Sequence, residues 1–142
     1  MTIARLIAGR SSPIISIESN AAVRDAVALL AEKRIGALPV IQEGSIVGIF
    51  SERDVVYGLA RQGAAMLDGP VGAAMTAPVI TVDPATEVLS ALALMTRRRI
   101  RHLPVVQGGA MVGFISIGDL VKHRIERIES EAQAMRSYIQ ST

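Results

Sequence analysis

Apolar residues recur along the chain at strand-like and helix-like spacings, and the same succession of spacings occurs twice. The first copy opens with a short β-branched run, PIISI (13–17), followed by AAVRDAVALLAEKR (21–34), whose apolar residues recur at helical spacing. Two more apolar runs come next, ALPVI (37–41) and SIVGIF (45–50), separated by Glu43-Gly44, a pair that favours a tight hairpin turn. The pattern predicts a β-α-β-β unit that a further helix completes.

The second copy matches the first without a gap, residues 13–56 aligning with residues 78–121. Identical residues recur along the whole alignment, including Pro13/Pro78, Val23/Val88, Leu38/Leu103, Pro39/Pro104 and Gly48/Gly113. Such density indicates an internal duplication, so the fold is built from the repeated unit. We therefore predict an α/β (α+β) protein in which two β-α-β-β-α units, related by a pseudo-twofold axis, pack through their sheets.

The phrase GIFSERD (48–54) returns as GFISIGD (113–119), and each copy keeps a serine with an aspartate three residues later. This spacing is typical of a helix start, where the serine caps a free N–H and the acid lies at the positive end of the helix. The same geometry offers N–H donors and a carboxylate to a ligand. For either copy taken alone, the structural interpretation is the favoured one.

Composition narrows the classes of function. Half of the 142 residues are hydrophobic and 20% are charged, so the chain can bury a core. It has no cysteine, which excludes disulfides and thiolate chemistry, and its two Phe, two Tyr and no Trp argue against stacking of single-stranded bases. A net charge of +2 is too small to imply a polyanionic partner, and it decides nothing further. No apolar run approaches the ~18 residues of a spanning helix, so we expect a cytoplasmic protein that binds no membrane.

The sequence shows no catalytic or metal-ligating constellation. Its only histidines are His102 and His123, and it has no HExxH, phosphate-loop or dinucleotide-binding motif. His123 is interpreted as a surface residue. We therefore expect a non-enzymatic protein with no catalytic and no metal-binding residues.

The tandem order, with LPV on a strand followed by glycine, two apolar residues, serine and aspartate, resembles a pair of CBS domains (a Bateman module). The carriers are LPVIQEGSIVGIFSERD and LPVVQGGAMVGFISIGD, and the resemblance covers roughly residues 2–125. It implies a stand-alone regulatory module that binds an adenine nucleotide between the repeats and signals to an unidentified partner protein. AMP is the expected ligand, with ATP, ADP, NAD(H) and S-adenosylmethionine as alternatives.

The resemblance also implies a set of nucleotide-binding residues. Asp54 and Asp119 would hold ribose hydroxyls, with Ser51 and Ser116 on ribose or phosphate oxygens. The polar residues of the two first strands would complete the clefts, and the segments around each LPV would line base and phosphate: Ser16, Thr81, Gly36, Ala37, Leu38, Pro39, Arg101, His102, Leu103 and Pro104.

The two clefts are not expected to be equal, because only the first copy of the phrase carries an arginine, Arg53. We expect the better site to combine Thr81, His102, Ser116 and Asp119. Arg53 and Arg101 would neutralise phosphate there, since a guanidinium pairs with it through two parallel hydrogen bonds. The sequence leaves open which cleft Arg53 serves.

The sequence divides into a first unit with an N-terminal helix (1–61), a linker (62–74), a second unit (75–125) and a C-terminal helical extension (126–142). Apolar residues of the last helix recur at spacings of four and three: Val121, Ile125, Ile128, Ala132, Met135 and Ile139. This narrow seam predicts a homodimer, to which ARLI (4–7) would contribute.

Two alternatives to the nucleotide sensor remain open. One is a ligand-independent dimeric scaffold that recruits a partner through the C-terminal helix. The other, ranked last, is nucleic-acid binding through the run Thr96–Arg99, which we interpret as a solvated helix end because cations are stabilised there.

Overall fold

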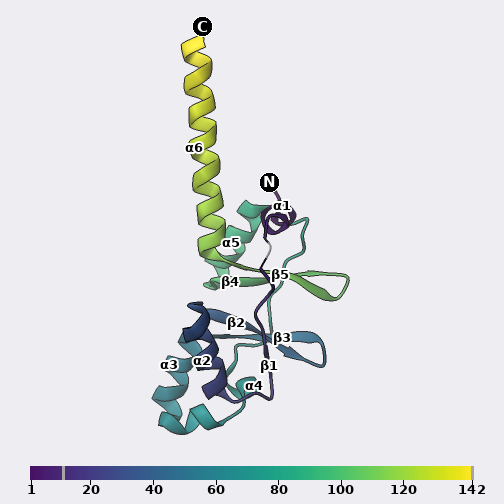
Figure 1. Ribbon diagram of the computed structural model, residues 1–142, viewed down its shortest axis with the longest axis vertical. Coiled ribbons are helices and arrows are strands. Elements are labelled where there is room, and N and C mark those ends of the chain that lie inside the picture. Colours follow the sequence, from purple (N-terminus) through teal and green to yellow (C-terminus); the bar gives the residue numbers. More distant parts are fainter. Residues whose placement is uncertain (11, 142) are drawn as a thin grey trace.

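The computed structural model describes residues 1–10 and 12–141 as two α/β units stacked along the long axis of the molecule (Figure 1). The predicted fold class is confirmed. The first unit consists of β1 (Ile17–Glu18), α2 (Val23–Lys33), β2 (Ala37–Gln42), β3 (Ser45–Ser51) and α3 (Glu52–Gln62). The second consists of α5 (Val88–Arg98), β4 (His102–Gln107), β5 (Ala110–Ser116) and α6 (Ile117–Ser141).

The two predicted hairpins form with matching registers. Strands β2 and β3 pair antiparallel with Leu38 opposite Phe50, and β4 and β5 pair with Leu103 opposite Ile115. Both turns need two consecutive residues with positive φ: 52° and 80° at Glu43-Gly44, and 59° and 80° at Gly108-Gly109. That backbone twist matches the twist of the flanking strands, which is why glycine occurs in both turns.

The first strand of each unit is much shorter than the sequence predicts. Only Ile17–Glu18 pairs, parallel to β2, and in the second unit Val82 makes a single bridge to Val105. The strand prediction is wrong for residues 13–16 and 78–81. Each run opens with a proline, which has no N–H to donate to a ladder. The chain there also passes from one unit to the other (Figure 1).

The predicted linker is structured and packs into the first unit. It forms a 3₁₀ turn (η1, Gly63–Asp68) and a short helix (α4, Val71–Ala74). Met66 and Val71 are buried in the same core as Phe50. The linker thereby adds apolar surface to a unit that has few buried aromatic residues.

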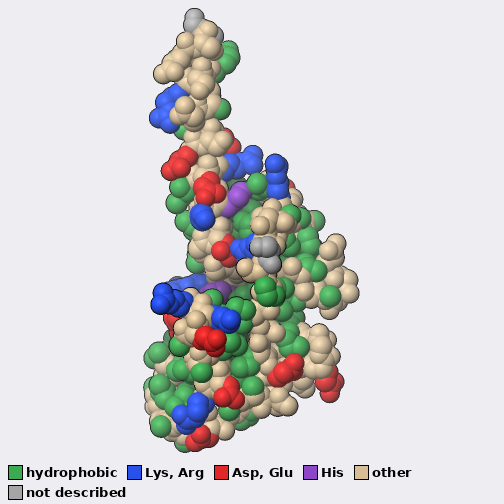
Figure 2. Space-filling view, viewed as in Figure 1, with side chains coloured by type: hydrophobic (Ala, Val, Ile, Leu, Met, Phe, Trp, Pro, Cys, Tyr) green, Lys and Arg blue, Asp and Glu red, His purple; other side chains and the backbone are tan. Residues whose placement is uncertain are grey.

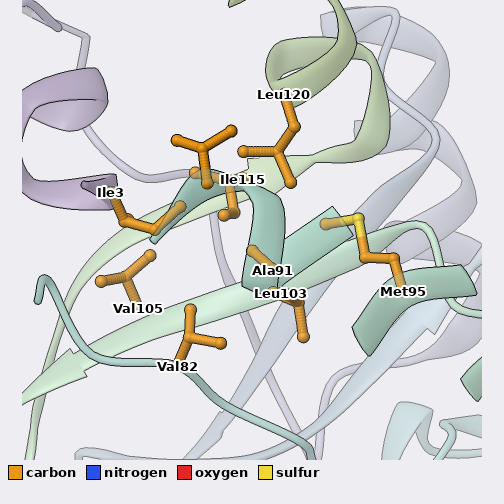
Figure 3. Packing of buried hydrophobic residues seen from close by; sticks show 9 residues of the cluster. Ile3, Val82, Ala91, Met95, Leu103, Val105, Ile115 and Leu120 are labelled. Atoms are coloured by element: carbon orange, nitrogen blue, oxygen red, sulfur yellow. The ribbon is translucent and has the colours of Figure 1, made fainter. Parts of the chain in front are cut away.

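The N-terminal helix α1 (Ile3–Ala8) packs on the second unit, although the sequence division assigned it to the first. Ile3 is fully buried in the second core (Figure 3). Its burial contributes roughly 1.5–3 kcal/mol to the stability of the fold. Its N–H donates to the Thr86 carbonyl at 2.9 Å, and the Ala4 N–H donates to the Pro84 carbonyl at 2.8 Å. From this anchor the chain crosses back to the first unit.

Helix α6 runs for 25 residues and projects beyond the body of the molecule (Figure 1), which confirms the predicted helical extension. At 1.5 Å per residue it is about 37 Å long. Leu120 is its only buried residue, and its apolar seam is exposed: Val121, Ile125, Ile128, Ala132, Met135 and Ile139. Within residues 1–10 and 12–141, no helix is long and apolar enough to cross a membrane.

Candidate functional site

Two cavities lie at the waist between the units, where basic, acidic and histidine side chains gather (Figure 2). The first cleft, about 230 Å³, includes Ser51 at the start of α3, and the second, about 520 Å³, includes Ser116 and Asp119 at the start of α6. Small-molecule sites commonly have volumes of about 300–1,000 Å³. Only the second cleft falls in that range.

Each cleft is built by both units, because the chain segment that precedes one repeat covers the helix start of the other. Residues 75–80, which run into the second repeat, supply Thr76 and Pro78 to the first cleft. The stretch of Arg10 and residues 12–15, which runs into the first repeat, supplies Arg10 and Ile14 to the second cleft. We call these two stretches the crossing segments.

In the first cleft, Asp54 is engaged by the protein itself and does not line the cavity. Its Oδ2 accepts hydrogen bonds from the Ser51 N–H at 2.9 Å and the Ser51 hydroxyl at 3.2 Å. Its Oδ1 accepts the Thr76 hydroxyl at 2.9 Å. Asp54 therefore caps α3 and ties the crossing segment down, which is the structural role that its spacing favoured.

In the second cleft, Asp119 forms the same cap but also lines the cavity. Its Oδ2 accepts the Ser116 N–H at 2.8 Å, and its own N–H donates to the Ser116 hydroxyl at 3.2 Å. Arg10 Nη2 reaches Oδ2 at 2.7 Å, and Arg10 Nη1 donates to the Phe114 carbonyl at 3.0 Å. Partial burial raises the pKa of Asp119, but the Ser116 and Arg10 donors lower it more, so the pKa lies below its ordinary value. The carboxylate is ionised at neutral pH.

His102 forms part of the wall of both clefts. Its ring stacks on Phe114 with the centroids 5.6 Å apart and the planes 12° from parallel. Burial lowers the pKa of His102, and the Arg101 charge lowers it too, against the opposing effects of Asp119 and Glu52. The imidazole is therefore mostly neutral at neutral pH, and it offers an aromatic surface to either cavity.

The arginines are divided between the two clefts differently from the prediction, which placed Arg53 and Arg101 in the cleft of Asp119. Arg53 and Arg101 line the first cleft, with Ser51, rather than the cleft of Asp119. Arg99, which the sequence assigned to a solvated charge run, lines the first cleft as well. The second cleft has Arg10 and Arg34 instead.

Sequence reasoning missed three of these arginines. Arg34 and Arg99 occupy equivalent positions in the two repeats, and each ends a helix in the left-handed conformation, with φ of 54° and 56°. Both repeats have arginine at this position of the alignment, and that match could have pointed to a shared role. Arg10 precedes the aligned repeats, so the duplication carries no information about it.

Several other predicted residues line neither cavity. Ser16 and Thr81 are exposed outside the clefts, whereas the leucine and proline of each LPV are buried within the units: Leu38, Pro39, Leu103 and Pro104. Gly36 lines both cavities and Ala37 lines the second.

Within the part of the chain that the structure describes, no group of three or more His, Asp or Glu side chains could hold a metal ion.

The CBS domain family matches the chain twice, at residues 7–61 and 71–126. The chain belongs to the CBS-domain family. The two matched segments correspond to the two repeats, so the structure is a CBS pair. Their boundaries leave the distal part of α6 outside the family match.

Known proteins resemble this CBS pair in sequence, and solved ones resemble it in fold as well. The mitochondrial protein CBSX3 of Arabidopsis thaliana is 40% identical over 83% of this chain, a region that spans 60% of that protein. A solved protein with CBS domains from Burkholderia ambifaria is 40% identical, with a TM-score of 0.83, over 89% of this chain and 95% of its own.

Two solved CBS proteins contain adenosine ligands. CBSX2 was solved with AMP; it is 26% identical, with a TM-score of 0.75, over 88% of this chain and 96% of its own. The CBS pair of protein MJ0100 was solved with 5′-methylthioadenosine and S-adenosyl-L-methionine. It is 25% identical, with a TM-score of 0.78, over 89% of this chain and 98% of its own.

Proposed function

We propose that this chain is a regulatory module that binds an adenine nucleotide in the second cleft and signals occupancy to a partner protein. One observation carries the proposal. A cavity of about 520 Å³ between the two CBS units presents Ser116, the ionised Asp119 and His102 together. Its size suits a nucleotide, and its polar groups converge at one end of a helix.

The chemistry of the second cleft matches the parts of a nucleotide. The Asp119 carboxylate can accept two hydrogen bonds from the vicinal hydroxyls of a ribose. Ile14 and Ile35 offer apolar surface to a base, and Arg34 offers a cation to a phosphate. AMP is the expected ligand because CBSX2 binds it in a related fold, and the MJ0100 pair supports the wider adenosine class.

The signal would arise because both units build the cleft. A ligand that contacts the crossing segment and the start of α6 stabilises one angle between the units over others, and the shift is limited by its differential affinity for the two arrangements. We propose a regulatory role rather than a catalytic one, because the two CBS matches cover most of the sequence. A cytoplasmic location stays a prediction, since CBSX3 is a mitochondrial protein.

The test is a binding panel of AMP, ADP, ATP, NAD⁺, NADH and S-adenosylmethionine, measured by calorimetry and by thermal unfolding. A ligand at a hundred times its Kd should stabilise the protein by about 2.7 kcal/mol, a shift of several degrees. Asp119→Ala should remove that shift. Asp25→Ala, an exposed aspartate in the first turn of α2, is the matched control and should keep it. The absence of any ligand-dependent shift in the wild-type protein would overturn the proposal.

The alternative function, a dimeric scaffold that needs no ligand, is favoured by the exposed seam of α6. Ile125, Ile128 and Met135 are 50%, 49% and 61% exposed, on a helix that extends beyond the CBS pair. An apolar a/d seam of this kind is stabilised when a second helix covers it. We propose a homodimer through α6, which is compatible with the sensor and essential for the scaffold.

Sedimentation equilibrium of the full chain separates the two functions. Ile128→Glu with Met135→Glu should convert a dimer to a monomer, while Ser130→Glu with Ser137→Glu adds the same charge on the other side of α6 and should not. If the seam variant loses assembly and no nucleotide binds the wild-type protein, the scaffold is the better description.

A further inference from the structure

We propose that Arg10 makes the second cleft selective for adenine nucleotides that carry a phosphate, because its guanidinium holds Asp119 until a phosphate replaces that carboxylate. The inference rests on the proposed function and adds a specificity-determining residue to it. Arg10 lies in the crossing segment between α1 and β1, outside the aligned repeats.

The first step is a competition for one carboxylate oxygen. Arg10 Nη2 lies 2.7 Å from Asp119 Oδ2, the oxygen that also accepts the Ser116 N–H. A ribose diol bound to Asp119 needs both carboxylate oxygens. Binding of a ribose therefore requires the guanidinium to leave Oδ2.

The second step is the difference between ligands. An uncharged adenosine or 5′-methylthioadenosine would break the charge-assisted pair and give Arg10 no anion in return. A nucleotide phosphate gives the planar guanidinium a new partner with two parallel hydrogen bonds. The Arg10 side chain is 37% exposed, so it can move without disturbing a packed core.

The third step is the charge around the cavity. The charged side chains that line the second cleft are Arg10, Arg34 and Asp119, and the His102 beside them is mostly neutral. Once Asp119 is used by the ribose, two guanidinium groups remain to face the rest of the ligand. This balance favours an anion over a neutral nucleoside or a sulfonium.

Within the residues that the structure describes, the first cleft has no ion pair equivalent to that between Arg10 and Asp119. The residue that corresponds to Arg10 by the repeat offset is Met75, whose thioether packs at Gly48. There the carboxylate of Asp54 is held by an uncharged hydroxyl, that of Thr76. Selectivity for phosphate through a displaced ion pair is therefore a property of the second cleft alone.

The experiment measures AMP and adenosine, two ligands that differ only in the phosphate, by calorimetry on the full chain. Arg10→Met installs the residue of the other crossing segment. Adenosine should bind this variant about two- to threefold more tightly, since an exposed ion pair no longer competes. AMP should bind about five- to tenfold more weakly, because a hydrogen-bonded charge is lost. The adenosine-to-AMP ratio of Kd values should thus fall by about tenfold or more.

Arg5→Met is the matched control, since Arg5 lies on α1, lines neither cleft and carries the same charge. Arg5→Met should leave the adenosine-to-AMP ratio of Kd values unchanged. Arg10→Lys keeps the charge without the planar fork, so its ratio should lie between those of the wild type and Arg10→Met. If the wild-type protein binds AMP but the Arg10→Met ratio stays within about twofold, the inference is wrong and the proposed function stands. The inference also fails if both ligands weaken together in Arg10→Met, because Arg10 would then only shape the cleft. If the wild-type protein binds neither ligand, the proposed function fails and the inference with it.

Discussion

The two clefts of this CBS pair start from the same repeated phrase and the same helix cap, but only one of them presents its carboxylate to a cavity. Asp54 accepts hydrogen bonds on both oxygens from Ser51 and Thr76, whereas Asp119 lines the larger cleft and is paired with Arg10. The repeat sets the backbone of both sites. The crossing segments, which lie at the edges of the repeat, make the difference, since one supplies the Thr76 hydroxyl and the other the Arg10 guanidinium.

The crossing segments differ in how they are attached. Over the first cleft, Thr76 and Ile49 exchange two backbone hydrogen bonds, of 2.8 and 3.0 Å. Over the second cleft, the carbonyl of Phe114, the counterpart of Ile49, accepts a side-chain bond from Arg10 instead. A side chain is easier to displace than a backbone bridge. This contrast accords with the volumes of about 230 and 520 Å³.

The largest expected effect comes from removing each carboxylate in turn. Asp119→Ala should weaken AMP binding about ten- to a hundredfold, the cost of losing hydrogen bonds to a charged group, and Asp54→Ala should change it less than about threefold. Each variant also loses a helix cap and should be destabilised by about 1 kcal/mol. Calorimetry gives the affinities, and urea unfolding gives the stabilities.

Equal losses of affinity in the two variants would show that the clefts bind alike, and the distinction drawn from Asp54 would then be wrong. A loss confined to Asp54→Ala would move the nucleotide to the first cleft. There the surrounding arginines, Arg53, Arg99 and Arg101, would take over the phosphate.

A smaller effect should distinguish the packing against Gly48, which faces Met75 and Thr76, from the packing against Gly113, which faces Ile7 of α1. A Cβ at Gly48 would lie 2.6 Å from the Met75 sulfur and 2.8 Å from the Thr76 carbonyl oxygen, whereas a Cβ at Gly113 would lie 3.1 Å from a methyl group of Ile7. The backbone oxygen cannot move aside easily, but the isoleucine side chain can.

Gly48→Ala should therefore lower the free energy of unfolding by about 1–3 kcal/mol, and Gly113→Ala by less than about 1 kcal/mol. Denaturant unfolding of both variants measures the difference. Similar losses for the two would mean that the Thr76 backbone yields as readily as the Ile7 side chain, and the closer approach at Gly48 would have no energetic consequence.

The duplication made much of this fold predictable, because each local signal was present twice. The hairpin turns, the helices before them and the Ser-x-x-Asp caps all follow from short-range spacing. The first strands were overestimated because residues 13–16 and 78–81 have strand-like composition but span the two units. The packing of α1 on the second core and the approach of Arg10 to Asp119 are contacts between distant segments. Neither has a counterpart in the repeat that could have revealed it.

The smallest expected effect concerns His102, the wall that both clefts share. Removing a nearby carboxylate should lower the pKa of His102 further, because a negative charge favours the imidazolium. Asp119 raises this pKa more than Glu52 does, so Asp119→Asn should lower it more than Glu52→Gln. NMR titration of the His102 ring measures both shifts, and the reverse order would show that His102 senses the first cleft more strongly than the second.

The lowered pKa of His102 also makes the stability of the fold depend on pH. Because the folded-state pKa of His102 is lowered, the unfolded chain takes up the proton first, near its ordinary value of about 6.5. Stability should fall as the pH drops below that value toward the folded-state pKa, and this part of the fall should disappear in His102→Gln.

Asp119 affects stability in a separate pH range. Its lowered pKa gives stability that is present above about pH 4 and is lost only at more acidic pH. Thermal unfolding between pH 7.5 and 5.5 therefore reports on His102 without interference from Asp119, and an unchanged pH dependence in His102→Gln would contradict this assignment.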